Sequence, residues 1–232
     1  MTTGTDVRAH LVLALDVGSL PECEALARKL AAWFPTVKIG LELYAEAGPA
    51  AIAQLRDQGF RVFADLKLHD IPNTVGRAAR VLGRHGVDFL NFHAAGGETM
   101  LRAGVEGLRE GAIDAGHAAP IALGVTVLTS DADASAFDAR LAVARKAGCE
   151  GVVCSGHEIA RARAAELRTM VPGVRFAGGD TQDQARVVTP GAAIAAGADW
   201  IVVGRAVTAA ADPEAAAARL HDEVAAALAA RC

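Results

Sequence analysis

The sequence has few aromatic residues and no concentration of basic ones. Phe, Trp and Tyr make up 4% of the 232 residues, so a row of aromatic side chains for stacking nucleic-acid bases is not expected. Lys and Arg number 23 against 27 Asp and Glu, the net charge is -4, and the basic residues are scattered singly. This composition excludes a basic surface of the kind that binds nucleic acids.

Cysteine is also scarce. The four cysteines, Cys23, Cys149, Cys154 and Cys232, form no CxxC pair and have no spacing suited to zinc. We therefore expect free thiols in a reducing compartment and no bound metal. Cys154, in "GVVCSG", is expected to be a small apolar strand residue and not a nucleophile.

Long apolar runs are missing as well. The start of the chain, "MTTGTDVRAH", lacks the apolar stretch of a signal peptide. No later run approaches the ~20 apolar residues of a membrane-spanning helix. We expect a soluble, cytoplasmic protein that does not associate with membranes.

What the sequence does have is a regular alternation of short apolar runs with longer segments rich in Ala, Leu, Arg and Glu. Eight runs predict strands: Leu11 to Asp16, Val37 to Gly40, Arg61 to Lys67, Asp88 to His93, Ile121 to Leu128, Gly151 to Ser155, Val174 to Gly178, and Trp200 to Gly204. Segments between them, such as "CEALARKLAAWF" and "EIARARAAELRTM", have helical periodicity.

Continuously apolar strands are typical of a parallel sheet covered by helices. Eight strand–helix units predict a (β/α)8 TIM barrel, with residues 1–232 forming a single domain. A doubly wound open sheet is the alternative, but it normally has fewer strands and often a GxGxxG loop, which this sequence does not contain.

Polar residues stand at or near the ends of these strands. They are Asp16, Lys38, Asp65 with Lys67, His93, Thr129 with Ser130, Arg175, and Gly204 with Arg205. In a TIM barrel the carboxyl ends of the strands face one mouth, so these residues are expected to converge there. Asp65 and Lys67 are two apart and are expected to point to the same side of their strand.

Each of these residues also has a purely structural alternative. Asp16 and Asp70 could cap the helices that follow them, and Lys38 could extend its amine to water. Asp65 and Lys67 could form a structural ion pair, and the histidines nearby could serve packing. The joint arrangement at successive strand ends is what favours a functional site.

One stretch identifies a family. "DLKLHDIPNT", Asp65 to Thr74, closely resembles the DxKxxDIxxT signature of the orotidine 5'-monophosphate decarboxylase family. Further blocks resemble the same family in the same order, namely "LALDV", "VKIGLELY", "GVTVLTS", "PGVR", "DQARVVTP" and "VVGRAV". Together they span nearly the whole chain.

The resemblance implies a cofactor-free TIM-barrel homodimer that converts orotidine 5'-monophosphate to uridine 5'-monophosphate and CO2. It implies a network of alternating charges at the reacting carbon, formed by Lys38, Asp65, Lys67 and Asp70, with Lys67 as the general acid. Asp70, Ile71 and Thr74 would reach across the dimer interface into the partner's site.

The resemblance also assigns the substrate contacts. Asp16 and Lys38 would hold the ribose hydroxyls, helped by Thr74 of the other subunit, and Thr129 and Ser130 would contact the pyrimidine. Gln184, Gly204 and Arg205 would bind the 5'-phosphate, with Arg175 near the same loop. Phe176 departs from the family pattern, which usually has proline after this arginine, and the stiffness of the loop is therefore open.

The charges suit this chemistry. Loss of CO2 from ring carbon C6 leaves an electron pair in an sp2 orbital outside the conjugated system, and no Schiff-base or thiamine electron sink is evident in the sequence. A fixed ammonium group can stabilise this pair and then deliver a proton. Two lysines against two aspartates leave the group near neutral, which makes its burial tolerable.

Two rival functions remain. Related barrels that decarboxylate or condense sugar phosphates use Mg²⁺ and have a carboxylate where this chain has Lys38, and a lysine opposes a dication instead of coordinating it. A catalytically inactive barrel that binds a nucleotide is the other rival, although every charged residue proposed above is present. Sensitivity of activity to a chelator separates the first rival, and loss of turnover on replacing Lys67 separates the second.

Overall fold

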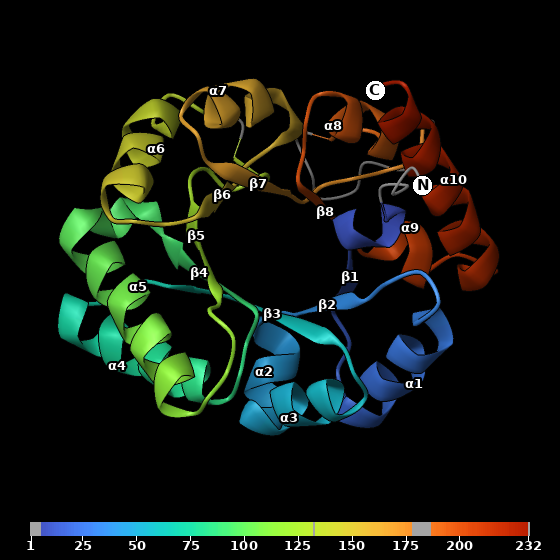
Figure 1. Ribbon diagram of the computed structural model, residues 1–232. Coiled ribbons are helices and arrows are strands. Elements are labelled where there is room, and N and C mark those ends of the chain that lie inside the picture. Colours follow the sequence, from blue (N-terminus) through green and yellow to red (C-terminus); the bar gives the residue numbers. More distant parts are fainter. Residues whose placement is uncertain (1–5, 132, 178–186, 232) are drawn as a thin grey trace, which may run out of the picture.

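The computed structural model describes residues 6–131, 133–177 and 187–231, in which eight parallel strands close into a barrel (Figure 1). Each strand pairs with the next along the chain, and β8 pairs with β1. The strands are β1 (Leu11–Leu15), β2 (Thr36–Ile39), β3 (Arg61–Leu68), β4 (Phe89–His93), β5 (Ile121–Val125), β6 (Gly151–Val153), β7 (Arg168–Val171) and β8 (Trp200–Val203). The predicted TIM barrel is confirmed.

Helices surround the barrel (Figure 1). They are α1 (Leu20–Leu30), α2 (Leu41–Ala47), α3 (Pro49–Asp57), α4 (Pro72–Arg84), α5 (Gly97–Asp114), α6 (Phe137–Lys146), α7 (Ile159–Ala164), α8 (Pro190–Ala195), α9 (Arg205–Thr208) and α10 (Pro213–Ala229). Short 3₁₀ helices lie at η1 (Val7–His10), η2 (Ala94–Gly96) and η3 (Gly156–Glu158). Within the described ranges, no helix is both long and apolar enough to cross a membrane.

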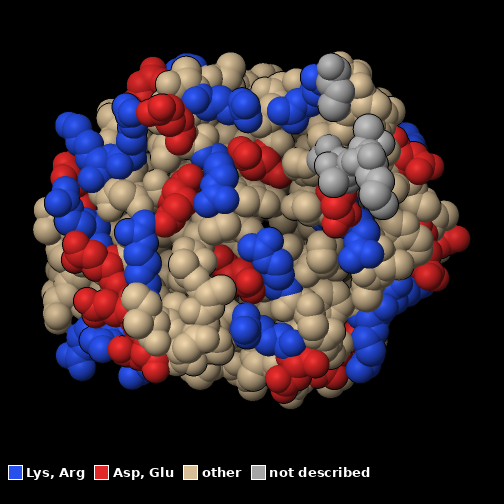
Figure 2. All heavy atoms as spheres, in the orientation of Figure 1, with Lys and Arg blue, Asp and Glu red and all other residues tan. Residues whose placement is uncertain are grey.

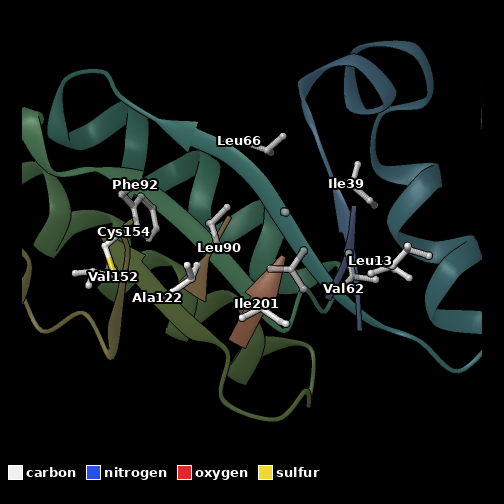
Figure 3. Packing of buried hydrophobic residues seen from close by; sticks show 14 of the residues in the cluster. Leu13, Ile39, Val62, Leu66, Leu90, Phe92, Ala122, Val152, Cys154 and Ile201 are labelled. Carbon is white, nitrogen blue, oxygen red and sulfur yellow. The ribbon is translucent and has the colours of Figure 1, made fainter. Parts of the chain in front are cut away.

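Side chains alternate along the strands between two apolar layers. Outward-facing residues such as Leu13 and Val62 belong to the layer between barrel and helices (Figure 3). Inward-facing residues fill the barrel, where the rings of Phe63, Phe89 and Trp200 meet edge to face at centroid distances of 6.1 and 5.0 Å. The barrel interior is therefore a packed plug, and a ligand can approach only at an end of it.

The seventh strand lies earlier in the chain than predicted. The prediction placed it at 174–178, whereas β7 is Arg168–Val171. Val174 forms only an isolated bridge with Val188. Arg175 consequently follows the strand in a loop and is not part of the strand.

The reason lies in segment 158–170, which was predicted to be one helix. The helix α7 ends at Ala164, and Glu166 has a φ of 60°, a left-handed conformation that does not continue a helix. The next residues enter the barrel, where Asp199 accepts a hydrogen bond from the Thr169 N–H at 2.8 Å. A tertiary contact from distant residues thus overrides the helical composition of this segment.

Acidic residues fix the start of the strands at the end of the barrel opposite the mouth. Asp88, Glu150 and Asp199 directly precede β4, β6 and β8, and each accepts a backbone N–H of the preceding strand at 2.8 Å. These hydrogen bonds fix the register of neighbouring strands, and so they help to set the positions of the carboxyl ends of the strands at the mouth.

Helices α4 and α5 touch through their backbones. A Cβ atom at Gly107 would lie 2.1 Å from the carbonyl oxygen of Gly76, and one at Gly111 would lie 2.0 Å from that of Arg80. No side chain fits at these two positions, which we call the glycine seam. Beside the seam, Arg80 pairs with Asp114 at 2.7 Å. The seam holds α4 against α5, and the first turn of α4 directly follows the loop of Asp70.

Candidate active site

A cavity of about 580 Å³ opens at the carboxyl ends of the strands. Apolar residues that face into the barrel, such as Phe63, Val153 and Val202, form part of its wall. Nine of the residues predicted from the sequence also line it, namely Asp16, Lys38, Asp65, Lys67, Thr129, Ser130, Arg175, Gly204 and Arg205. Acidic and basic side chains lie next to one another around a hollow at the centre of the face seen in Figure 2.

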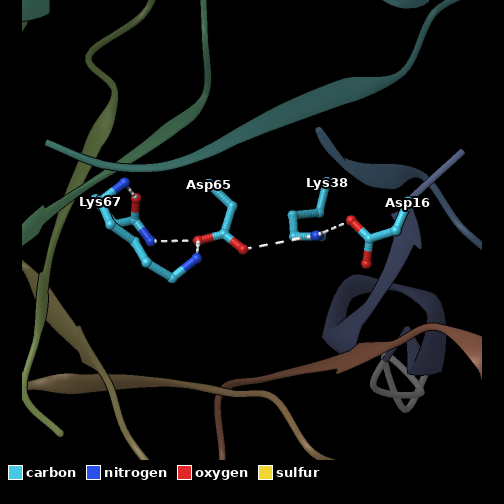
Figure 4. Close-up of polar contacts among 5 residues, drawn as sticks. Asp16, Lys38, Asp65 and Lys67 are labelled. Atoms are coloured by element: carbon cyan, nitrogen blue, oxygen red, sulfur yellow. Dashed lines mark hydrogen bonds and ion pairs between the residues drawn. The ribbon is translucent and has the colours of Figure 1, made fainter. Parts of the chain in front are cut away.

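Four of these side chains form a row of alternating charge, the charge row (Figure 4). Lys38 Nζ donates to Asp16 Oδ1 at 2.5 Å and lies 3.6 Å from Asp65 Oδ2. Lys67 Nζ donates to Asp65 Oδ1 at 2.6 Å. The Lys38 side chain is 8% exposed and that of Asp65 is 16% exposed. Charges this deeply buried are tolerable because each has an opposite charge beside it.

Two structural alternatives suggested by the sequence are wrong. The helix α1 is capped by Ser19, whose Oγ accepts from the Glu22 N–H at 3.4 Å, and not by Asp16. Lys38 does not extend its amine to water but ends between two carboxylates. The pair of Asp65 and Lys67 is present, as one part of the larger charge row.

The strand β3 is irregular where it carries these charges. Ala64 pairs with Leu90 and Leu68 with Phe92, so β3 advances four residues while β4 advances two. Within this bulge, Lys67 has a φ of 49°, the left-handed region that residues with a Cβ rarely occupy. Asp65 and Lys67 do line the same cavity, as their spacing predicted, but through a bulge and not through regular alternation.

Asn91 is a residue of this site that the sequence analysis missed. It lies in β4 and is fully buried. Its Oδ1 accepts from the Lys67 N–H at 2.7 Å, and its Nδ2 donates to Asp65 Oδ1 at 2.7 Å. The available signal was a single amide side chain in the middle of the apolar run "FLNFH".

The surroundings of Asp65 favour its ionised form. Burial opposes ionisation, but Lys38 and Lys67 nearby and the hydrogen bonds from Lys67 and Asn91 outweigh it, and the pKa of the Asp65 carboxyl lies below its ordinary value of 3.8. A group whose pKa is lowered on folding stabilises the protein above its unfolded pKa, and this contribution is lost as the pH falls through the folded pKa.

The variant Asp65→Asn is therefore expected to lower the free energy of unfolding by about 2 kcal/mol at neutral pH, because it removes the carboxylate shared by the buried Lys38, which keeps Asp16, and the partly exposed Lys67. The difference from the parent should begin to shrink as the pH falls below 3.8, where the carboxyl of the unfolded chain takes up a proton, and should disappear as the pH passes the lower pKa of the folded protein. Urea unfolding at neutral pH and at a pH below 3.8 measures the difference in free energy of unfolding. Asp57→Asn, which replaces an exposed aspartate of α3, is the control and should change the stability little at either pH. A difference that stays constant or grows in acid would contradict this.

A second group of polar residues lines the cavity from the segment that follows β8. Gly204 directly precedes α9, and Arg205 opens that helix. Thr208 of α9 also lines the cavity and was not predicted. Gln184 falls outside the described residues.

The loop that carries Arg175 is held from outside the barrel. Arg175 donates through Nη1 to the carbonyl oxygen of Val174 at 2.9 Å, and its N–H donates to that of Val188 at 3.0 Å. Phe176, which departs from the proline of the family motif, packs on the core with the Arg219 guanidinium 4.3 Å from its ring centroid. An aromatic contact to α10 thus restrains this side of the loop.

Asp70, Ile71 and Thr74 stand apart from the cavity of their own chain. All three are exposed, Ile71 to 64%. Asp70 does not cap α4 from the N-cap position, which is Ile71, and its Oδ1 accepts the Ile71 N–H at 2.6 Å. Their assignment to a partner's site stays a prediction.

The two histidines beside the charge row stack on each other. The rings of His69 and His93 lie 5.3 Å apart between centroids. Burial, together with the positive charges of His69, Arg140 and Lys67, lowers the pKa of His93. In the part of the chain that the structure describes, no three His, Cys, Asp or Glu side chains are grouped so that they could hold a metal ion.

Comparison with known proteins decides the family. A sequence model of the orotidine 5'-phosphate decarboxylase / HUMPS family matches residues 9–220. The chain belongs to this decarboxylase family. Curated decarboxylase relatives include the orotidine 5'-phosphate decarboxylase of Moorella thermoacetica, 46% identical over 238 residues with 94% of each chain covered. That of Nitratidesulfovibrio vulgaris strain DSM 19637 is 48% identical, with 89% of this chain and 93% of the relative covered.

Solved structures support the same decarboxylase fold. The orotidine 5'-phosphate decarboxylase of Lactobacillus acidophilus superposes with a TM-score of 0.77 at 32% identity, covering 92% of this chain and 98% of that one. An uncharacterized conserved protein of Geobacillus kaustophilus gives a TM-score of 0.78 at 38% identity, covering 92% and 99%. The resemblance first drawn from "DLKLHDIPNT" is confirmed.

Proposed function

We propose that this chain decarboxylates orotidine 5'-monophosphate to uridine 5'-monophosphate and CO2 without a cofactor, and that Lys67 protonates the product carbanion. The observation that carries the proposal is the charge row, in which two lysines and two aspartates alternate along one wall of a cavity with an apolar floor. Family membership supports the same activity, since the curated relatives named above are orotidine 5'-phosphate decarboxylases.

In the proposed reaction the bond between C6 and the carboxylate carbon breaks, CO2 leaves, and the electron pair stays on C6. The ammonium of Lys67 stabilises this pair as it forms and then transfers a proton to C6, which gives the neutral product ring. Asp65 fixes the Lys67 amine through the contact at 2.6 Å. Because the amine is held before the reaction, little reorganisation is needed when the charge develops.

The remaining residues of the cavity are proposed to hold the nucleotide. Asp16 and Lys38 would bind the ribose hydroxyls, and Thr129 and Ser130 the pyrimidine edge. Arg175, Gln184, Gly204 and Arg205 would bind the phosphate, which in TIM barrels commonly sits between the loops after the seventh and eighth strands. Arg205 offers a planar guanidinium that can bind two phosphate oxygens at once.

The active unit is proposed to be a homodimer. Asp70, Ile71 and Thr74 are exposed and lie outside the cavity of their own chain. An exposed isoleucine beside an aspartate, at the mouth of the barrel, fits an interface that brings Asp70 to the partner's charge row. There it would be the second carboxylate next to Lys67, after Asp65, and the third of the charge row.

The position of Lys38 argues against a metal-dependent reaction of the sugar-phosphate type. Its ammonium lies between Asp16 and Asp65, at 2.5 and 3.6 Å from their oxygens. A divalent cation bound by these two carboxylates would have to displace it, and the two positive charges repel each other.

Loss of the ultraviolet absorbance of orotidine 5'-monophosphate, followed with and without EDTA, tests this function. We expect turnover at the same rate in both conditions. Absence of turnover in both conditions would refute the activity. Loss of turnover only in the presence of EDTA would refute the cofactor-free reaction and favour a metal-dependent reaction like that of the sugar-phosphate barrels. A sugar phosphate as substrate serves as the negative control.

A further inference from the structure

The strand β3 presents its two charges through a bulge, and a single side chain on the neighbouring strand contacts both ends of the bulged segment. We infer that Asn91 is a positioning residue for the decarboxylation. Its amide holds the backbone of Lys67 and the carboxylate of Asp65 in the arrangement that presents the Lys67 amine to the substrate. This inference rests on the proposed function.

The orientation of the amide follows from its two partners. The Lys67 N–H can only donate, and the Asp65 carboxylate can only accept. The contacts of 2.7 Å on each side therefore require Oδ1 toward Lys67 and Nδ2 toward Asp65. The opposite orientation would set donor against donor and acceptor against acceptor, so the orientation of the amide is unambiguous. We call this pair of hydrogen bonds from Asn91 to Lys67 and Asp65 the bridge.

The bulge explains why the bridge is needed. Between Ala64 and Leu68 the ladder of hydrogen bonds between β3 and β4 is interrupted, and within this interval Lys67 adopts its left-handed φ of 49°. A backbone N–H that is partly withdrawn from water requires an acceptor, and Asn91 Oδ1 supplies one in place of a strand carbonyl. The hydrogen bond thereby stabilises a conformation that a residue with a Cβ otherwise disfavours.

The same amide also fixes the carboxylate. Asp65 Oδ1 accepts from Asn91 Nδ2 at 2.7 Å and from Lys67 Nζ at 2.6 Å, which leaves Oδ2 facing Lys38 at 3.6 Å. Rotation of the carboxylate out of its present plane would break all three contacts. Asn91 therefore sets both the backbone from which the Lys67 side chain starts and the oxygen to which its amine is tied.

No other ordinary side chain of this size provides both contacts. An ionised aspartate accepts but cannot donate to Asp65, and leucine does neither. A protonated aspartic acid, however, donates through its O–H and accepts through its carbonyl oxygen, and so reproduces the pattern of asparagine. This difference turns pH into a direct test of the bridge.

The variant Asn91→Asp is expected to lower kcat for orotidine 5'-monophosphate by about 10²-fold at slightly alkaline pH, since small misplacements of catalytic groups cost this much. Among the described residues, the charged and titratable groups around the new carboxyl include Asp65 of β3, which contacts the present amide at 2.7 Å, the amines of Lys67 and Lys38, which pair with Asp65, and His93, two residues on in β4. As the pH falls, the ratio of the variant's kcat to the parent's should rise by up to about tenfold per pH unit, because one proton restores the donor.

Affinity for uridine 5'-monophosphate should change by less than about fivefold, because the proposed ribose and phosphate contacts do not involve Asn91. Asn91→Leu should lose kcat similarly, with no recovery at lower pH. Thr169→Val, which removes another buried polar contact at the far end of the barrel, is the control and should show a ratio independent of pH.

The inference would be overturned if Asn91→Asp binds uridine 5'-monophosphate but the ratio of its kcat to the parent's does not change with pH. So would an Asn91→Asp protein that fails to fold even at the acid end of the range, because the protonated side chain should replace the amide there. If the parent itself has no turnover, the proposed function fails; if only the pH recovery is missing, the inference alone fails.

Discussion

Replacement of Lys67 by alanine is expected to lower kcat for orotidine 5'-monophosphate by at least about 10⁴-fold, because both the proton donor and the stabilising ammonium are lost. The protein should remain folded. The Lys67 side chain is 32% exposed, and after its removal Asp65 keeps the Lys38 ammonium at 3.6 Å and the amide of Asn91 at 2.7 Å. Steady-state absorbance measurements with saturating substrate give kcat, and circular dichroism reports the fold.

Binding of uridine 5'-monophosphate distinguishes a lost proton donor from a damaged pocket. Calorimetry with Lys67→Ala should give an affinity within about tenfold of the parent's, since most proposed contacts to ribose and phosphate remain. Lys146→Ala, an exposed lysine in the last turn of α6, is the matched control and should turn over normally. Undiminished turnover by Lys67→Ala would remove this residue from its assigned role and reopen the case for an inactive nucleotide-binding barrel.

Mixing two inactive variants is expected to restore activity if the site is shared between subunits. In a hybrid of Asp70→Ala with Lys38→Ala, one site combines the intact Lys38 of the first chain with the intact Asp70 of the second. The other site carries both substitutions. Random mixing makes about half of the dimers hybrids, so about a quarter of the parent activity should return.

A second mixture provides the control. Lys38 and Lys67 lie in the same chain's charge row, joined through Asp65. Hybrids of Lys38→Ala with Lys67→Ala therefore contain one defect in each site and should stay inactive. Hybrid formation can be verified by mass spectrometry of the intact dimers under native conditions. If the Asp70 and Lys38 hybrids form and remain inactive, Asp70 does not act across the interface.

The barrel and most of its mouth could be predicted because both follow from local rules. Continuously apolar runs mark strands that are covered on both faces, and polar residues that close such runs have no other place than the mouth. These rules alone predict that Asp16, Lys38, Asp65 and Lys67 lie together. The charges within "FADLK" were the strongest signal, because an unpaired charge in a buried strand is too costly to keep.

The features that were missed depend on contacts between distant residues. The seventh strand lies in a segment of helical composition and is held by Asp199, which is 30 residues from its partner Thr169. The conformation of Lys67 depends on Asn91, 24 residues away. Thr208 reaches the cavity because a short helix begins at Arg205, directly after β8. No local pattern encodes the contacts of Asp199 and Asn91, and the place of Thr208 depends on where β8 ends.

The glycine seam decides where this molecule can adjust. Since α4 and α5 meet backbone against backbone at Gly107 and Gly111, neither helix can slide or tilt without collision, and the two behave as one rigid body. A movement of Asp70 that leaves this helix contact intact is then confined to the residues between the end of β3 and Pro72. We expect that short stretch, and not the two helices, to take up any adjustment at the proposed interface between subunits.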